Sequence, residues 1–255
     1  MSGWQPLLKL IEKEYRNNPT EYLIQPTISR CLHPAWNDLA EAFWDDMLKY
    51  EEFSTNYMHK MHEIENIKYN PTKFKPHLSM STIQHTRHLL LMKKYVNSNL
   101  EDYDYITEAG GGYGNLCRLS RMFGFKNEYQ LIDFPLILEI QKSYLNSAKI
   151  KGVLFSELTS EIFNPIGKSI FITTFAMNEM PKQDRLIIKK QLYKYSDIFI
   201  VYNRSYNGID NIKYFSLLAD RLKDTFDVTI HSDEQHMEKG RKKAWILAAK
   251  NKGVV

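Results

Sequence analysis

Residues 106–119, ITEAGGGYGNLCRL, place an acidic side chain just ahead of closely spaced glycines. The residues that set this spacing are Glu108, Gly110, Gly112 and Gly114. Glycine admits positive φ angles and lets the main chain approach a ligand closely. The dinucleotide fingerprint G-x-G-x-x-G would need its last glycine at Asn115, so the spacing disfavours a dinucleotide. It favours another nucleotide-like ligand, held by one carboxylate and a bare stretch of backbone.

A second carboxylate, Asp133, ends the β-rich run EYQLID and stands two residues before Pro135. In that place a carboxylate can accept hydrogen bonds from both hydroxyls of a ribose. The alternative is that Asp133 helps to start the helix that Pro135 opens. Phe134, between them, either packs beside an adenine or belongs to the core.

Short β-rich runs alternate with helical ones from residue 104 onward, which predicts a parallel sheet with right-handed crossovers. The expected strands cover 104–109, 128–133, 152–155, 169–175, 197–202, 227–232 and 243–250. The expected helices cover 115–123, 135–148, 182–195 and 211–226. No helix separates the last two strands, so they must form a hairpin. We therefore expect an α/β, Rossmann-like, seven-stranded and mostly parallel sheet in the order 3-2-1-4-5-7-6, with an antiparallel end.

Residues 1–100 are expected to be a helical N-terminal region or lid, with the ligand-binding domain at 101–255. Residues 33–50, HPAWNDLAEAFWDDMLKY, predict a helix, because Leu39, Phe43, Met47 and Tyr50 follow at three- and four-residue spacing and so lie on one helix face. Residues 79–96, SMSTIQHTRHLLLMKKYV, predict a further helix before the first strand.

An acid followed by G-x-G-x-G resembles the first motif of class I S-adenosylmethionine-dependent methyltransferases, whose sheets also end in a hairpin. The resemblance implies S-adenosyl-L-methionine as cofactor, with Glu108 helping to hold its amino-acid end and the glycines making room for its methionine and ribose portions. The cofactor contacts expected on this basis are Glu108, Gly110, Gly112, Tyr113, Gly114, Asp133, Phe134, Thr174 and Phe175.

A narrower resemblance points to a family of sugar O-methyltransferases. It is carried by GGGYG at 110–114, IDFP at 132–135 and QKSYL at 141–145, with Phe134 where that family has leucine. The family also has Ser-Glu-Met after its fourth strand, and here Glu179 and Met180 match while Asn178 departs. The ending HMEKGRKKAWILAAK is similar as well. This resemblance implies a sugar or glycan hydroxyl as the methyl acceptor.

Methyl transfer to an alcohol needs a group that takes up the hydroxyl proton. The loops that follow the strands offer Glu179 and His236 as candidate bases; either could instead be structural, Glu179 as a helix cap and His236 as a solvated hairpin residue. Candidate acceptor contacts at the same edge are Asn178, Asn203, Arg204 and His231. The stretch HSDEQHME also has metal-ligand chemistry, so a divalent ion is an alternative, although no fixed ligand spacing supports it.

The bulk composition fits a folded globular protein of 255 residues with 25% charged residues and a formal net charge of +4. That balance gives no argument for nucleic acid as the main partner. Two distant cysteines form no disulfide or metal pattern. No signal peptide or membrane span is recognised, so we expect a cytoplasmic protein.

Rival interpretations remain open at this stage. The acceptor could be a small-molecule phenol or amine, or the chain could be an inactive binding module of the same fold. A nucleic-acid N-methyltransferase is disfavoured because TFAMNEMP lacks the (D/N)PP(Y/F) motif. An NAD-dependent reductase is the most distant alternative.

Overall fold

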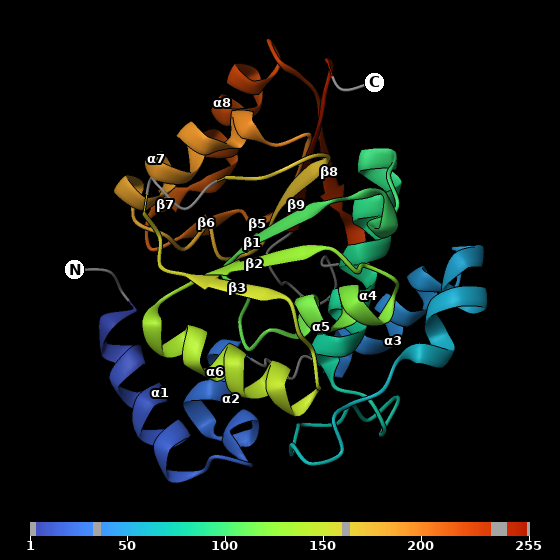
Figure 1. Cartoon of the computed structure of the whole chain (residues 1–255), viewed down its shortest axis with the longest axis vertical. Helices are drawn as coiled ribbons and strands as arrows, with labels where there is room; N and C mark the ends of the chain where they lie inside the picture. Colours follow the sequence, from blue (N-terminus) through green and yellow to red (C-terminus); the bar gives the residue numbers. More distant parts are fainter. Residues whose placement is uncertain (1–3, 33–36, 160–163, 236–243, 254–255) are drawn as a thin grey trace. The chain divides into compact units, whose positions relative to one another are not determined.

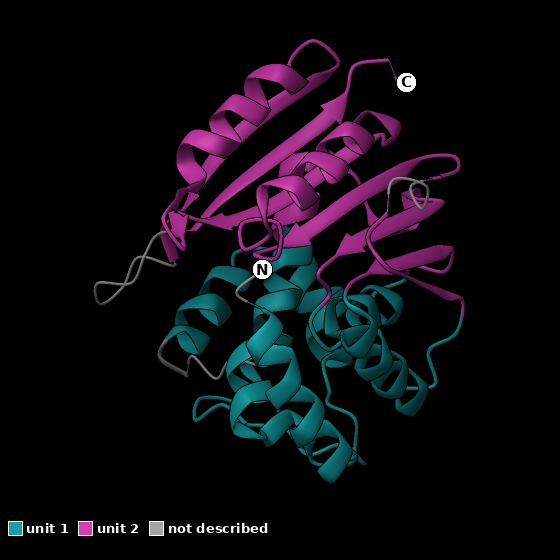
Figure 2. Ribbon diagram, turned by 90° about the vertical axis from the view of Figure 1, so that its left-hand side faces the viewer, with its two compact units in different colours: residues 1–90, 112–124, 134–151 teal, residues 91–111, 125–133, 152–255 magenta. Residues whose placement is uncertain are grey.

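A computed structural model describes residues 4–32, 37–159, 164–235 and 244–253. The chain divides into two compact units that interleave along the sequence (Figure 2). One, the helical unit, comprises residues 1–90, 112–124 and 134–151; the other, the sheet unit, comprises residues 91–111, 125–133 and 152–255. The expected division into residues 1–100 and 101–255 stays a prediction. Each unit is described below by itself.

The sheet unit is built on seven strands in the order β3-β2-β1-β4-β5-β9-β8 (Figure 1). Strands β1 to β5 run parallel to one another, and β9 pairs antiparallel with both β5 and β8. The expected order 3-2-1-4-5-7-6 and the antiparallel end are therefore confirmed. The strands are β1 (Tyr105–Ala109), β2 (Glu128–Ile132), β3 (Val153–Ser156), β4 (Ser169–Thr174), β5 (Asp197–Asn203), β8 (Phe226–Asp233) and β9 (Ala244–Asn251).

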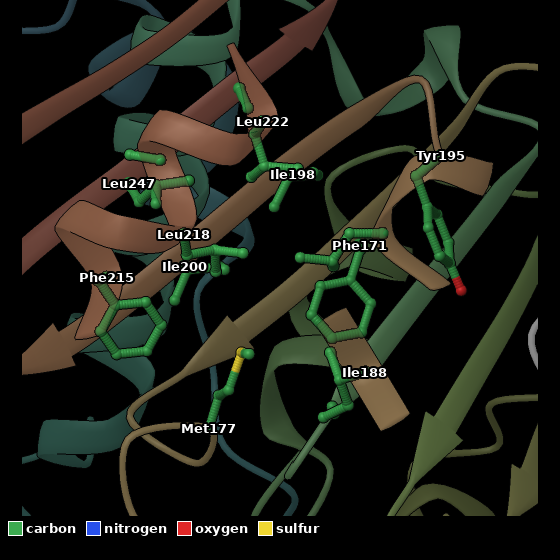
Figure 3. Packing of buried hydrophobic residues seen from close by; sticks show 14 of the residues in the cluster. Phe171, Met177, Ile188, Tyr195, Ile198, Ile200, Phe215, Leu218, Leu222 and Leu247 are labelled. Carbon is green, nitrogen blue, oxygen red and sulfur yellow. The ribbon is translucent and has the colours of Figure 1, made fainter. Parts of the chain in front are cut away.

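One face of β4, β5 and β9 supports a hydrophobic core with α7 (Lys182–Gln191) and α8 (Asn211–Leu222). Figure 3 shows Phe215, Leu218 and Leu222 of α8 turned toward Ile198 and Ile200 of β5. Their spacing of three and four residues puts the helical side chains on one face, and alternate strand residues point to the same side of the sheet. This core fixes the carboxyl ends of β4 and β5, where candidate acceptor residues lie.

Two features of the sheet unit differ from expectation. A small hairpin, β6 (Ser205–Tyr206) with β7 (Ile209–Asp210), lies within the segment after β5. Asn207 and Gly208 turn it with φ angles of 44° and 78°, as a two-residue hairpin turn requires. Strand β8 covers Phe226–Asp233, one residue longer at each end than the expected strand at 227–232, and His231 lies within it.

The helical unit contains the helices expected within residues 33–50 and 79–96, together with the two that follow β1 and β2. Its α1 contacts both α2 and α6. Its helices are α1 (Gln5–Asn17), η1 (Tyr22–Ile24), α2 (Pro26–Leu32), α3 (Asn37–Met47), η2 (Phe53–Tyr57), η3 (Met58–Lys60), α4 (Met80–Met92) as far as residue 90, α5 (Asn115–Met122) and α6 (Pro135–Ser147). The end of α4, η4 (Lys93–Asn97), η5 (Leu100–Asp102) and η6 (Leu192–Lys194) belong to the sheet unit.

None of the helices in the described ranges is long and apolar enough to cross a membrane.

Candidate functional site

Glu108 is a buried carboxylate near the end of β1, with 1% of its surface exposed. Its Oε2 accepts a hydrogen bond of 2.7 Å from the hydroxyl of Tyr129, which stands on the neighbouring strand β2. Its Oε1 accepts none from the residues that the structure describes. The pKa of Glu108 is raised to about 7: burial raises it most, the Tyr129 hydrogen bond lowers it, and the like charge of Asp133 raises it by a smaller amount. Such a carboxyl group is incompletely bonded and would gain from a cationic ligand.

The loop that leaves β1 packs its backbone closely on both sides. Gly110 has a φ angle of 75°, and a Cβ at this position would overlap the Cβ of Ala176 in the loop after β4. A Cβ at Gly111 would lie 2.6 Å from Leu131 and 3.2 Å from the Glu108 carboxyl carbon. The two glycines thus bring main chain against the neighbouring loop and over the acid. They lie beside the point between β1 and β4 where the strand order reverses, which is where such sheets bind ligands.

The rest of the glycine loop belongs to the helical unit. Gly112 has a φ angle of 56°, and its carbonyl accepts a hydrogen bond of 3.1 Å from Gln141 of α6. Gly114, with a φ angle of 96°, precedes the first residue of α5. The Tyr113 side chain is buried edge-to-face against Tyr144, so its ring is part of the core of this unit. Only the main chain of Tyr113 therefore remains a candidate for ligand contact.

Asp133 follows β2 directly and is half-buried. Its backbone N–H donates to the Ser156 carbonyl at the end of β3, over 3.2 Å, which fixes the main chain at this edge of the sheet. Phe134, the next residue in the chain, precedes the first residue of α6 in the helical unit, and its ring lies 6.4 Å from that of Trp4. Phe134, the residue before α6, supplies no side-chain cap to that helix. Both interpretations of Asp133, as a ribose contact and as a residue that helps to start α6, stay predictions.

The loop after β4 contains a strained residue. Thr174 ends the strand half-buried, and Phe175 adopts a φ angle of 66°, which is rare for a large side chain. The Phe175 N–H donates to the Val201 carbonyl of β5 over 2.8 Å, which holds this conformation. Non-glycine residues of this kind cluster at ligand sites, so the strain agrees with the predicted cofactor contact.

A buried arginine organises the loops after β4 and β5. Arg185 of α7 is fully buried and donates to the carbonyls of Asn178 and Met180, at 2.5 and 2.9 Å, and to the Asn211 side chain at 2.9 Å. Burial lowers its pKa. None of the described carboxylates forms an ion pair with it. Arg185 therefore donates its hydrogen bonds to amide oxygens rather than to a carboxylate.

This network places the candidate acceptor contacts. Asn178 is buried; its Oδ1 accepts from the Asn203 N–H at 3.1 Å, and its Nδ2 has no hydrogen-bond partner among the described residues. Glu179 is half-buried in the same loop, and Arg204 is exposed after β5. The structure thus brings Asn178 and Asn203 into contact. It places Glu179 and Arg204 in the loops where they were expected.

His231 has partners of its own within the sheet unit. Its ring stacks on Tyr95 of η4 at 3.9 Å and contacts the Thr229 hydroxyl at 3.0 Å. Burial and the nearby Lys94 lower its pKa. His236, the second candidate base, lies outside the described residues. Within the described ranges no three His, Cys, Asp or Glu side chains are grouped as metal ligands would be.

Sequence reasoning missed three residues at this edge, namely Gly111, Tyr129 and Arg185. Gly111 falls at an unspecified position of G-x-G-x-G. Its place in a run of consecutive glycines nevertheless indicates main chain that packs too closely for a side chain. Tyr129 and Arg185 occur in an ordinary strand and a charged helix, where nothing in their neighbours signals their bonds.

The arrangement fits S-adenosylmethionine chemically. A buried carboxylate with a vacant oxygen suits an ammonium group, and a carboxylate at the end of β2 suits a ribose. No family model and no curated protein sequence matches the chain.

Solved structures match it in fold. The N-methyltransferase NodS from Bradyrhizobium japonicum WM9, in complex with S-adenosyl-L-homocysteine, has a TM-score of 0.50 over 66% of this chain and 87% of its own, at 8% identity. Precorrin-6y C5,15-methyltransferase from Geobacter metallireducens GS-15 has a TM-score of 0.50 over 75% and 100%, at 11% identity. Identity this low concerns the fold alone. The chain has the Rossmann-like fold of class I S-adenosylmethionine-dependent methyltransferases.

Proposed function

We propose that this chain is an S-adenosylmethionine-dependent O-methyltransferase whose acceptor is a sugar or glycan hydroxyl. The observation that carries the cofactor assignment is Glu108, a buried carboxylate beside the strand-order reversal of a methyltransferase-like sheet, whose Oε1 accepts no hydrogen bond from the described part of the chain. Holding such a group in the folded state is costly unless a cation completes its bonding. The α-ammonium of S-adenosylmethionine is such a cation.

The remaining cofactor contacts follow from the ends of the strands. Asp133 would accept the two ribose hydroxyls, and Phe134, next in the chain, would lie beside the adenine. Thr174 and Phe175 would meet the cofactor from the loop after β4, where the main chain is already held in an unusual conformation. Gly112 and Gly114 would contribute bare main chain with positive φ angles.

When bound, the cofactor supplies a methyl group activated by its sulfonium. The protein must align the acceptor oxygen with that carbon on the side opposite sulfur. The new C–O bond forms as the C–S bond breaks, the sulfur keeps the electron pair, and the hydroxyl proton passes to a base. We propose Glu179 or His236 as that base, with Asn178, Asn203, Arg204 and His231 as candidate acceptor contacts.

The sugar assignment rests on the resemblance carried by GGGYG, IDFP, QKSYL and the Glu179–Met180 pair. One contact adds support, because Gln141 of the third motif donates to the Gly112 carbonyl of the first. Two segments of the resemblance are thus coupled in the folded helical unit. We take the acceptor to be an alcohol of a carbohydrate and make phenols, amines and RNA outcomes of the test.

The cofactor is tested by calorimetric titration of the protein with S-adenosylhomocysteine and, separately, with NAD. We expect binding of the first alone, and a loss of at least about tenfold in Asp133→Asn, because a neutral amide accepts ribose hydrogen bonds less strongly. Asp227→Asn, an exposed strand residue of the same type, is the matched control. Binding of NAD alone would reject the proposal.

The acceptor is tested with methyl-labelled cofactor and a panel of sugar glycosides, phenols, amines and oligonucleotides. Label in glycosides supports the assignment, and label only in another class rejects it. Glu179→Gln and His236→Ala should keep S-adenosylhomocysteine affinity while at least one loses turnover; Glu101→Gln, an exposed acid, is the control. Full turnover in both variants would remove them as bases.

A further inference from the structure

The hydroxyl of Tyr129 is the hydrogen-bond partner that the described residues give to Glu108. It is fully buried on β2, and its hydrogen bond to Glu108 Oε2 measures 2.7 Å. The bond leaves Oε1 as the vacant oxygen. Tyr129 thus decides which of the two carboxylate oxygens stays available and in which direction the side chain is held.

The main chain at Gly111 lies against the same carboxylate. A Cβ at this residue would stand 3.2 Å from the carboxyl carbon and 3.3 Å from the very oxygen that Tyr129 holds. The main chain therefore passes directly over the acid because residue 111 has no side chain. The carboxylate is confined between a tyrosine hydroxyl on one strand and a bare peptide of its own loop.

The electrostatic setting makes this hydrogen bond consequential. In the sheet unit, Tyr129 and Asp133 are the titratable groups that act on Glu108; the strand neighbours opposite it, Leu131 and Ile172, are apolar. Burial and the Asp133 charge favour the protonated acid, and the Tyr129 hydroxyl favours the anion. The balance lies close to neutral pH, so losing one hydrogen bond would change the charge of the site.

We propose that Tyr129 is a positioning residue for cofactor binding, whose hydrogen bond orients Glu108 and favours its carboxylate form, so that the oxygen Oε1 can pair with the ammonium of the cofactor. This inference rests on the proposed function, because it assumes a cationic ligand at Glu108. It adds a residue on β2 that has no place in the glycine motif and does not touch the cofactor itself.

The test compares Tyr129→Phe with the wild type by titration of S-adenosylhomocysteine between pH 6 and pH 9. A hydrogen bond to a charged group is worth enough to predict about a tenfold loss of affinity near pH 7. At pH 9 both proteins carry an ionised Glu108, so the ratio of their dissociation constants should fall to about two or less. Taking this ratio at each pH cancels the titration of the ligand.

Tyr195→Phe is the matched control. Tyr195 is also a buried tyrosine, and its hydroxyl donates over 2.8 Å to Thr107, the residue before Glu108 on β1. Its removal costs a hydrogen bond of the same kind without touching the carboxylate. We expect its ratio to the wild type to stay constant across the pH range. A constant ratio for Tyr129→Phe as well would overturn the proposal and leave Tyr129 a structural residue.

The single variant Glu108→Gln and the double variant Glu108→Gln/Tyr129→Phe complete a double-mutant cycle with the wild type and Tyr129→Phe. In the Glu108→Gln background the tyrosine change should alter affinity equally at every pH, since no carboxylate remains to titrate. Urea unfolding of the four proteins across the same pH range tests the pairing without any cofactor. If the wild type fails to bind S-adenosylhomocysteine, the proposed function fails. The Glu108–Tyr129 interaction is still supported if Tyr129→Phe changes stability in a pH-dependent way when residue 108 is Glu but not when it is Gln. It is rejected if the effect on stability does not depend on pH when residue 108 is Glu.

Discussion

The sheet unit buries two charged side chains near its carboxyl edge, and they are treated in opposite ways. Arg185 donates hydrogen bonds to three oxygens, two in the loop after β4 and one on the first residue of α8. Glu108 accepts one hydrogen bond, and its second oxygen is left without a partner among the described residues. A buried charge is tolerated when its hydrogen-bonding capacity is filled. Arg185 therefore serves the fold, whereas Glu108 is, under the proposed function, kept for a ligand at a cost in stability.

The largest effect is expected on the side of the fold. Arg185→Met would leave the carbonyls of Asn178 and Met180 and the Asn211 side chain without their donor, at a cost of about 3 kcal/mol in the free energy of unfolding. Arg221→Met, an exposed arginine of α8, should stay within about 0.5 kcal/mol. Urea unfolding measures both. Affinity for S-adenosylhomocysteine should survive in the folded fraction; if it falls while stability holds, the two charges are not functionally separate.

The loop over Glu108 gives the next largest effect. Gly110→Ala places a Cβ in overlap with Ala176, whereas Gly208→Ala, at nearly the same φ angle, meets no atom within 4 Å. Both variants share the backbone strain of a positive φ angle. The difference between them therefore isolates the close contact of the two loops. We expect the free energy of unfolding of Gly110→Ala to be about 2 kcal/mol lower than that of Gly208→Ala because of overpacking. Equal thermal or urea stability would show that the loops do not depend on this contact.

The smallest effect concerns Glu108 itself and has the opposite sign. Its pKa in the folded protein is about 7, above the value of an unfolded carboxyl group. The folded state thus holds the proton more tightly, so this contribution to stability is fully present below the unfolded pKa and is lost as pH rises through about 7.

Glu108→Gln removes that dependence. Relative to the wild type, the variant should gain on the order of 1–2 kcal/mol between pH 5 and pH 8 while its affinity for S-adenosylhomocysteine falls. Glu101→Gln, an exposed acid, should show neither change. Urea unfolding over this range is the measurement. A stability difference that does not vary with pH would mean that Glu108 is ionised throughout, like an ordinary surface acid.

The sequence was sufficient for the order of the sheet because that order depends on features spread along the whole chain. Alternating strands and helices require crossovers, and two final strands without a helix require an antiparallel end. The β6–β7 hairpin was missed although Asn207–Gly208 is a strong signal for a two-residue turn. Strands of two residues carry almost no hydrophobic pattern, so nothing on either side of the turn indicates a hairpin.

Within the site, the sequence placed Glu108 and Asp133 at the ends of their strands but could not reveal their electrostatic state. That state depends on Tyr129, a contact 21 residues away in the chain that only the sheet register creates. The burial of Arg185 was equally hidden, since KQDRLIIKK reads as a solvated helix. The roles proposed for Glu179, His236 and the acceptor contacts stay predictions.

Strand β9 occupies an interior position of the sheet although it is the last strand along the chain. During synthesis on the ribosome, β5 and β8 must therefore emerge without the neighbour that finally joins them. Until residues 244–251 are released, the exposed edge of β5 is open to pairing with other nascent chains. A premature stop ahead of β9 would thus produce an aggregating product, even though every residue of the glycine loop had already been made.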